Sequence, residues 1–339
     1  MTLSRALKGA LLALLAACSL QAQAWTRSPA TPFAALPAGT AHPEGIAADA
    51  QGNLYVADFD VSKAAGPGNI VVFDRAGRLL RKLDVAGSSA LLLGIAFHPL
   101  TGALLVIDFG NQQVLTVDPQ TGAAVPFASI PGGAAAGPNA LAFDALGDVY
   151  ISDSFQGRIW KTSAAGGAVS EWVSDPLLTT SGVPPFGANG IAFNRAGTSL
   201  FVANTGNDTV VRIPVEGGVA GAPEVFVNSI NGADGLLIDG DDNLWVAANQ
   251  ADEIVVLNPS GKVIAKLGDF DGIDPHGAPR GLLFPASLVL SDGFVYVTNL
   301  SLDLRLFGLP QTVDSQWAAA VSRHTVARIK AQIPPVQGR

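Results

Sequence analysis

Cysteine is almost missing from this chain of 339 residues, because Cys18 is its single cysteine. A lone cysteine excludes a disulfide framework and any Cys-rich zinc motif. Histidine is also rare and scattered, and the four histidines are His42, His98, His276 and His324. No Gly-rich phosphate loop, G-x-S-x-G elbow or Ser/His/Asp arrangement is evident. The sequence therefore does not support a zinc enzyme, a P-loop nucleotide enzyme or a hydrolase with a serine triad.

Positive charge is scarce as well. The chain has 20 Lys+Arg against 28 Asp+Glu, and its net charge is −8. The first 24 residues contain Arg5 and Lys8 and no acids, so their removal brings the net charge to about −10. Nucleic-acid binding requires a basic surface, so we expect no nucleic-acid partner. An excess of carboxylates fits a bound hard cation, although solubility explains it equally well.

Long hydrophobic runs are missing too, and the N-terminus has only a short one. Residues 1–24 have the features of an export signal: a basic start, an apolar core at Gly9–Ala17 and the cleavage motif Ala22-Gln23-Ala24. The apolar core is far shorter than a membrane-spanning helix, so we expect no transmembrane segment. The protein is therefore predicted to be periplasmic or secreted, with a folded domain at 25–339. The residues before Cys18 also resemble a lipobox, which leaves a lipid anchor at Cys18 as the alternative.

Glycine and proline are abundant, with 38 Gly and 22 Pro, as expected for short strands and tight turns. A short motif recurs about every 45 to 50 residues, a period typical of radial repeat folds. Its six copies are Glu44-Gly45-Ile46-Ala47, Leu93-Gly94-Ile95-Ala96, Asn139-Ala140-Leu141-Ala142, Asn189-Gly190-Ile191-Ala192, Asp234-Gly235-Leu236-Leu237 and Arg280-Gly281-Leu282-Leu283. Alternating apolar runs joined by turns follow each copy and predict antiparallel strands.

These repeats predict an all-β fold, a six-bladed β-propeller with four-stranded antiparallel blades. After Phe294–Asn299 the last blade has only one further strand-like run, near Arg323–Lys330. The N-terminal segment Thr31–Leu36 precedes the first motif, where a fourth strand would stand. We therefore expect this N-terminal strand to join the last blade and close the ring, which removes an open sheet edge.

The first residue of each motif would lie at the central channel of such a propeller. Read along the six copies, this column is Glu44, Leu93, Asn139, Asn189, Asp234 and Arg280. Four of the six are oxygen donors, and hard oxygen ligands suit Ca²⁺ or another divalent cation. Three interpretations remain open: a polar ring without an ion, an ion with a purely structural role, and an ion that takes part in catalysis or substrate binding.

The segments around the four donors, residues 42–45, 138–144, 188–193 and 234–239, resemble signature segments of the regucalcin/gluconolactonase (SMP-30/gluconolactonase/LRE-like) family. The resemblance covers essentially the whole mature chain. It implies a six-bladed propeller lactonase that depends on a divalent cation. By this resemblance Glu44, Asn189 and Asp234 match metal ligands, and Asn139 matches a residue that contacts substrate or metal-bound water. The order of the four donors is also similar to that of diisopropyl fluorophosphatase, where all four approach calcium, and paraoxonases are more distantly similar.

Two departures from the family pattern concern the substrate. Gly137 stands where sugar lactonases of the family carry an arginine, and Ala140 stands where an aspartate often follows the asparagine. The expected rim of the pocket is apolar and contains Phe59, Phe109, Phe155 and Phe186. A less polar ester, lactone or organophosphate is therefore at least as plausible as a sugar lactone.

The expected activity is that of a lactonase or esterase, a hydrolase of carboxylic ester bonds. Asp234, or a water that it orients, would be the base or nucleophile. Arg280 could bind a carboxylate or phosphoryl oxygen of the substrate or balance the nearby acids, and His276 could shuttle protons or be a solvated loop residue. Two other classes stay open: a non-catalytic binding propeller with NHL-like repeats, and a lyase acting on a cyclic ester with a histidine base near the channel.

Overall fold

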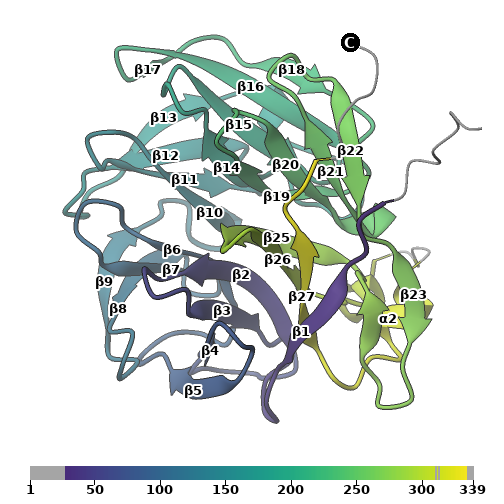
Figure 1. Cartoon of the computed structure of the whole chain (residues 1–339). Coiled ribbons are helices and arrows are strands. Elements are labelled where there is room, and N and C mark those ends of the chain that lie inside the picture. Colours follow the sequence, from purple (N-terminus) through teal and green to yellow (C-terminus); the bar gives the residue numbers. More distant parts are fainter. Residues whose placement is uncertain (1–26, 310, 312–313, 334–339) are drawn as a thin grey trace, which may run out of the picture.

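The computed structural model describes residues 27–309, 311 and 314–333. In this part of the chain, six antiparallel sheets are arranged around a common centre, as Figure 1 shows. Blades 1 to 3 are formed by β2 (His42–Ala48), β3 (Leu54–Phe59), β4 (Asn69–Phe73) and β5 (Leu79–Asp84); β6 (Leu92–Phe97), β7 (Leu104–Asp108), β8 (Gln113–Val117) and β9 (Ala124–Ser129); and β10 (Pro138–Phe143), β11 (Val149–Asp153), β12 (Arg158–Thr162) and β13 (Ser170–Ser174).

Blades 4 and 5 follow the same plan, and blade 6 is built from both ends of the chain. Their strands are β14 (Ala188–Phe193), β15 (Ser199–Asn204), β16 (Thr209–Glu216) and β18 (Glu224–Val227), with the short β17 (Val219–Ala220) also on β16; β19 (Ala233–Ile238), β20 (Leu244–Ala248), β21 (Glu253–Leu257) and β22 (Val263–Leu267); and β25 (Pro285–Ser291), β26 (Phe294–Asn299), β27 (Thr325–Lys330) and β1 (Thr31–Ala35). The predicted all-β, six-bladed propeller is confirmed.

The ring is closed as the sequence predicts. Strand β1 pairs antiparallel with β27, and Thr31 lies opposite Arg328 and Ala35 opposite Thr325. Blade 6 therefore has the order β1-β27-β26-β25, with the N-terminal strand outermost. Because the first and last described strands share one sheet, separation of the blades would require breaking this pairing.

A β-bulge at the start of every inner strand positions the residues of the repeated column. In blade 1, the pairing of β2 with β3 shifts register between Pro43 and Ile46, and the five other inner strands show the same shift. A bulge leaves an extra residue unpaired and changes the direction of its side chain. The bulged residues of β2 are Glu44 and Gly45, so the backbone itself turns the first motif residue away from the sheet.

The small residue in second place of each motif allows neighbouring inner strands to touch. A Cβ added to Gly45 would lie 2.3 Å from the carbonyl oxygen of Leu93, and one added to Gly190 would lie 2.3 Å from that of Asp234. Glycine is required at these positions because a side chain would collide with the backbone of the next blade. The recurrent glycine therefore reflects blade-to-blade packing around the axis.

The sixth motif copy proposed from the sequence is wrong. Arg280 belongs to β24 (Pro279–Gly281), which pairs with β23 (Phe270–Ile273) in a separate two-stranded sheet. The inner strand of blade 6 is β25, and a Cβ on Gly235 would meet the carbonyl oxygen of Ala286 at 2.5 Å, just as Gly45 meets Leu93. Ala286 is thus the sixth member of the column. The segment before β25 contains a Gly-Leu-Leu sequence that imitates the motif.

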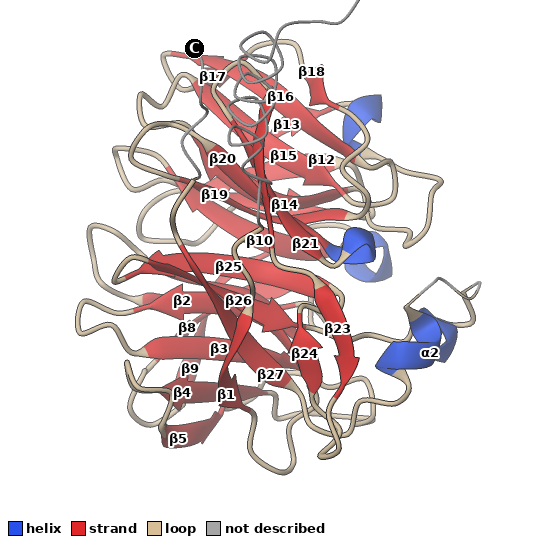
Figure 2. Ribbon diagram, turned by 45° about the vertical axis from the view of Figure 1, so that its right-hand side comes forward, coloured by secondary structure: helices blue, strands red, loops and turns tan. Residues whose placement is uncertain are grey.

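Short helical segments and the β23–β24 hairpin lie on one side of the ring in Figure 2. The helical segments are η1 (Gly133–Ala135), η2 (Pro176–Leu178), η3 (Asn249–Ala251), η4 (Leu304–Phe307) and α2 (Ser315–Ala318). None of the helices in the described ranges is long and apolar enough to span a membrane. The predicted export signal at 1–24 and the proposed anchor at Cys18 lie outside the described residues.

Candidate metal and substrate site

The four oxygen donors of the column meet at one cavity. Glu44, Asn139, Asn189 and Asp234 all line it, although they belong to blades 1, 3, 4 and 5. Each of these side chains is buried, with 4 to 6% of its surface exposed. The cavity has a volume of about 40 Å³, and a second cavity of about 90 Å³ continues along the inner strands. Residues up to 190 positions apart in the sequence thus share one small chamber.

Three of the four donors are held by a side chain from their own blade. The amide nitrogen of Asn139 donates to Ser154 Oγ at 3.2 Å, and that of Asn189 donates to Thr205 Oγ1 at 2.9 Å. With their nitrogens engaged in this way, both amides keep their carbonyl oxygens available as ligands. Ser154 Oγ in turn donates to the carbonyl oxygen of Ala188 at 2.7 Å, which fixes the direction of the hydroxyl.

The carboxylate of Asp234 is held in the same manner and keeps one free oxygen. Asn249 Nδ2 donates to Asp234 Oδ2 at 3.0 Å, whereas Asp234 Oδ1 is buried and has no hydrogen-bond partner. Glu44 Oε2 is also buried and without a partner. A buried, unpartnered carboxylate oxygen is costly, and a cation is the group that best compensates two of them at once. The donor set therefore fits a hard divalent cation.

The electrostatics of the chamber agree with this geometry. Burial raises the pKa of Glu44 well above its ordinary value, and the nearby Asp234 raises it further. Burial also raises the pKa of Asp234 to about 7, although the hydrogen bond from Asn249 and the nearby amide of Asn189 oppose the shift. Without a cation, the two carboxyl groups therefore retain protons at pH values where ordinary carboxyl groups are ionised.

The remaining wall of the chamber is apolar. Its lining residues of this kind are Phe59, Leu93, Pro184, Phe186, Phe284, Leu300, Leu302 and Leu304. Above it the predicted aromatic rim is present: the ring centroids of Phe109 lie 6.1 Å from Phe59 and 5.6 Å from Phe155, and Phe155 lies 5.4 Å from Phe186. Phe307 of η4 stacks on Phe59 at 6.5 Å and extends this rim.

Gly137 has a specific role beneath the aromatic rim. A Cβ at this position would lie 2.7 Å from the ring of Phe155, and the Gly137 N–H donates to Asp153 Oδ1 at 2.9 Å. The phenyl ring therefore occupies the space that a side chain at position 137 would need. The departure from the sugar-lactonase pattern at Gly137 and the presence of Phe155 are thus two parts of one local arrangement.

Arg280 and His276 lie away from the donors. Arg280 is exposed, and its Nη2 donates to the backbone oxygen of Asp271 within the β23–β24 hairpin. His276 is exposed in the turn of the same hairpin, where its N–H donates to Asp274 Oδ1 at 2.7 Å. Neither residue lines the chamber. The sequence-based expectation that Arg280 shares the ring is therefore wrong, because the ring position belongs to Ala286.

The structure also reveals site residues that the sequence reasoning missed, namely Ser154, Thr205 and Asn249. Each is the residue directly after the second strand of its blade, following β11, β15 and β20. A signal was available in the repeat, because this position holds a polar residue in the three consecutive blades that also have a polar inner residue. The correspondence between the inner donor and the residue after the second strand becomes visible only when these two strands of a blade are aligned side by side.

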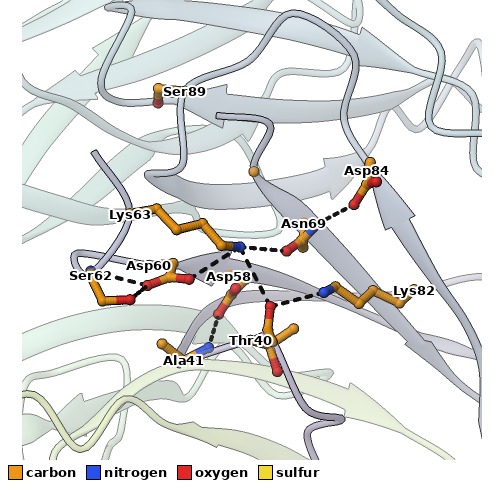
Figure 3. A network of polar contacts seen from close by, with 12 residues as sticks. Thr40, Ala41, Asp58, Asp60, Ser62, Lys63, Asn69, Lys82, Asp84 and Ser89 are labelled. Carbon is orange, nitrogen blue, oxygen red and sulfur yellow. Dashed lines mark hydrogen bonds and ion pairs between the residues drawn. The ribbon is translucent and has the colours of Figure 1, made fainter. Parts of the chain in front are cut away.

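A polar network supports the entrance to β2, the strand that carries Glu44 (Figure 3). Asp58 Oδ1 accepts from the N–H of Ala41 at 2.8 Å, and burial raises the pKa of Asp58 to about 7. Lys63 contacts Asp60 Oδ2 at 3.1 Å and donates to Asn69 Oδ1 at 3.0 Å. Asp58 thus ties the end of β3 to the residue before β2, and Lys63 ties the loop after β3 to β4 and, through the carbonyl oxygen of Gly39 at 3.5 Å, to the segment before β2. None of these side chains lines the chamber.

The fold and the chamber define the class: a six-bladed propeller with an oxygen-donor site that faces an apolar pocket. The chain belongs to the family described as "SMP-30/Gluconolactonase/LRE-like region", whose model matches residues 93–268. This match is slightly more than half of the chain and contains Asn139, Asn189 and Asp234, whereas Glu44 lies before it. No curated protein matches the chain significantly.

Many solved structures share the fold. A luciferin-regenerating enzyme superposes with a TM-score of 0.63 at 17% identity, covering 86% of this chain and 92% of that one. Regucalcin from Agrobacterium tumefaciens str. C58, described as a calcium-binding protein, gives 0.62 at 16% identity, covering 91% and 99%. A streptogramin B lyase gives 0.56 at 18% identity, covering 82% and 83%. At such identities the similarity establishes the fold alone.

Proposed function

We propose that this protein is an exported, Ca²⁺-dependent hydrolase that opens a lactone or cleaves a related ester. The observation that carries the proposal is the convergence of Glu44, Asn139, Asn189 and Asp234 on one small cavity with two unpartnered carboxylate oxygens. Membership of the gluconolactonase-like family supports the lactone or ester as substrate class. The calcium-binding regucalcin of the same fold supports the choice of ion.

The cation would be held by Glu44, Asn139, Asn189 and Asp234. Two carboxylates and two amide oxygens make a hard, negatively charged donor set, which suits Ca²⁺ better than Zn²⁺. The chemistry that Ca²⁺ supplies at such a site is polarisation of the substrate carbonyl and stabilisation of the negative charge that develops on its oxygen.

The residues of the chain contribute position and proton transfer. Asp234 has one oxygen engaged by Asn249 and one free oxygen in the chamber, so it is placed to accept a proton from the attacking water or to attack the carbonyl itself. Ser154 and Thr205 hold Asn139 and Asn189 in one orientation, which keeps the donor set preorganised. The aromatic rim adds an apolar surface beside the chamber, on which the rest of a substrate can lie.

Export is proposed from the sequence alone. The first 24 residues have the organisation of a signal peptide, with a basic start, a short apolar core and the motif Ala22-Gln23-Ala24. Cell fractionation combined with mass determination of the mature N-terminus tests this. Cleavage after Ala24 supports a soluble exported protein, and a lipid-modified Cys18 supports an anchored one.

The hydrolase proposal is tested with a panel of lactones and aryl esters, assayed with Ca²⁺ and with a chelator. Hydrolysis that requires the ion and is lost in Asp234→Ala supports the proposal. Activity that survives both treatments would overturn the mechanism. If calcium raises the melting temperature while no substrate is cleaved, the ion has a structural role and the binding-propeller alternative is favoured.

The lyase alternative requires a histidine base at the channel. Among the described residues, no histidine lines the chamber, and His276 is exposed in its hairpin turn. The structure therefore offers no support for a histidine-based lyase, and hydrolysis remains the function that the site supports best.

A further inference from the structure

The deep chamber is too small to enclose a whole substrate. Its volume of about 40 Å³ corresponds to about three or four water molecules, since about 10–15 Å³ is needed for each. Only a group the size of a carbonyl can therefore reach the four donors in this conformation. On the side of the chamber that the apolar residues line, the remainder of a substrate lies against this wall and the rim above it, so these surfaces help to decide which substrates are accepted.

The wall and rim that face this remainder are almost entirely hydrocarbon. Phe59, Leu302 and Phe186 are among the lining residues, and no lysine, arginine or histidine in the described ranges reaches the lining. At the rim, two aromatic side chains remain open to solvent: Phe155 is 45% exposed and Phe307 is 47% exposed. Two exposed phenylalanines next to a polar chamber form an apolar surface that a ligand can cover.

The packing of the rim also leaves no space for a polar side chain at position 137, next to Phe155. The ring of Phe155 packs over Gly137, where any Cβ would approach the ring to 2.7 Å. Phe155 makes further ring contacts with Phe109 at 5.6 Å and with Phe186 at 5.4 Å. The aromatic surface is thus continuous from the chamber to the solvent on this side.

Resting on the proposed function, we propose that the substrate of this site is a lactone or ester with an alkyl or aryl substituent, and that the site discriminates against polyhydroxylated lactones. The carbonyl enters the donor chamber, and the substituent lies on Phe155 and the neighbouring rings. A sugar lactone would place hydroxyl groups against phenyl and leucyl side chains, and each hydroxyl left without a partner weakens binding by roughly 10-fold.

The test compares three lactones with the full mature chain and Ca²⁺: an unsubstituted five-membered lactone, the same ring with a hexyl chain, and gluconolactone. We expect kcat/KM for the hexyl lactone to exceed that for the other two by at least about 10-fold. In Phe155→Ser, kcat/KM for the hexyl lactone should fall by about 10-fold, and that for the unsubstituted lactone should change by less than about twofold.

Leu146→Ser is the matched control. Leu146 is 77% exposed in the turn after β10, at the opposite end of this strand from the donor Asn139, so its replacement should leave all three rates unchanged. Binding of a hexyl-substituted lactam, which resists hydrolysis, is measured by calorimetry on the same variants. This second measurement does not depend on turnover, and melting temperatures report whether each variant is folded.

The outcomes separate the two proposals. Preferred cleavage of gluconolactone would overturn the substrate class while the hydrolase function stands. If nothing is cleaved but the lactam binds and loses affinity in Phe155→Ser, the apolar site is supported and the hydrolase function fails. Equal effects of Phe155→Ser on the hexyl and unsubstituted lactones would show that the rim does not contact the substituent, which also overturns the inference.

Discussion

The two halves of the chamber are built on the same backbone plan and have opposite chemistry. In blades 3, 4 and 5 the residue after the second strand is Ser154, Thr205 or Asn249, and it hydrogen-bonds the inner donor of its own blade. In blades 1, 2 and 6 the equivalent residues are Phe59, Phe109 and Leu300. The fold supplies six equivalent positions, and the side chains divide them into a polar half, which holds the oxygen donors, and an apolar half.

Glu44 is the exception that joins the two halves. It belongs to blade 1, beside Phe59, and its Oε2 has no hydrogen-bond partner. The other donors are oriented by neighbours, whereas the unpartnered oxygen of Glu44 would be compensated only by the proposed cation. The comparison therefore predicts that substitutions on the polar side and at Glu44 weaken ion binding most. Substitutions on the apolar side should change substrate choice most.

The largest effect is expected from Asp234→Asn. This change removes one of the two carboxylates, so the melting-temperature increase caused by Ca²⁺ should disappear and hydrolysis should fall by at least about 100-fold. The ion-free variant should be no less stable than the ion-free parent, because the repulsion with Glu44 is removed. Calorimetric unfolding with Ca²⁺ and with chelator measures both effects.

Asp241→Asn is the control for this experiment, since Asp241 is exposed in the turn after β19, at the opposite end of the strand. It should retain the full response to Ca²⁺. An undiminished response in Asp234→Asn would show that the cation does not bind at these donors.

The next effect is a dependence of Ca²⁺ affinity on pH. The pKa of Asp234 is raised to about 7, and that of Glu44 is also raised, both first of all by burial. Ca²⁺ must displace the retained protons, so its affinity should weaken as the pH falls below about 7, by about 10-fold per pH unit for each proton displaced. Calcium titrations between about pH 5 and pH 8 test this, and a constant affinity would contradict it.

The stability of the ion-free protein should change in the opposite direction. At pH values between the ordinary pKa of a carboxyl group and the raised value, the folded state binds more protons than the unfolded state. The free energy of unfolding should therefore decrease as the pH rises from about 4 to about 7. Below about pH 4 both states are protonated at these groups, so the free energy of unfolding no longer depends on them there. Asp58 and Asp252 also have pKa values raised by burial, so they contribute to the same dependence of stability on pH. The contribution of Glu44 and Asp234 is therefore measured as the difference between the pH dependence without Ca²⁺ and that with Ca²⁺.

A smaller effect should follow removal of one orienting group. In Thr205→Val the amide nitrogen of Asn189 loses its partner at nearly constant side-chain volume, and Ca²⁺ affinity should decrease by about 10-fold. Phe59→Leu, in the equivalent position of the apolar half, should change Ca²⁺ affinity by less than about threefold. Similar losses in both variants would mean that the two halves do not differ in the way the structure indicates.

The smallest effects should come from His276→Ala and Arg280→Ala. Both residues are exposed in the β23–β24 hairpin and do not line the chamber, so kcat/KM and Ca²⁺ affinity should stay within about twofold of the parent. A loss of activity in either variant, at unchanged melting temperature, would place the hairpin in the substrate path and would require a conformation other than the one described.

The repeat in the sequence was sufficient to predict the blades, the closure by the N-terminal strand and the meeting of Glu44, Asn139, Asn189 and Asp234. The physical reason is that each motif carries its own bulge and its own small residue for contact with the next blade. Because the bulge and the small residue recur in every blade, they produce a repeat that is visible in the sequence.

The tertiary structure alone decided the sixth position of the ring, the partners of the donors and the shape of the apolar half. The Gly-Leu-Leu segment after Arg280 satisfies the local pattern, but pairing of β25 with β26 gives the position to Ala286. The pairs Asn189–Thr205 and Gly137–Phe155 depend on which strands become neighbours. Contacts of this kind join separate strands, and the donor–partner contact occurs in blades 3, 4 and 5 but not in blades 1, 2 and 6. Only the folded chain shows which blades make it.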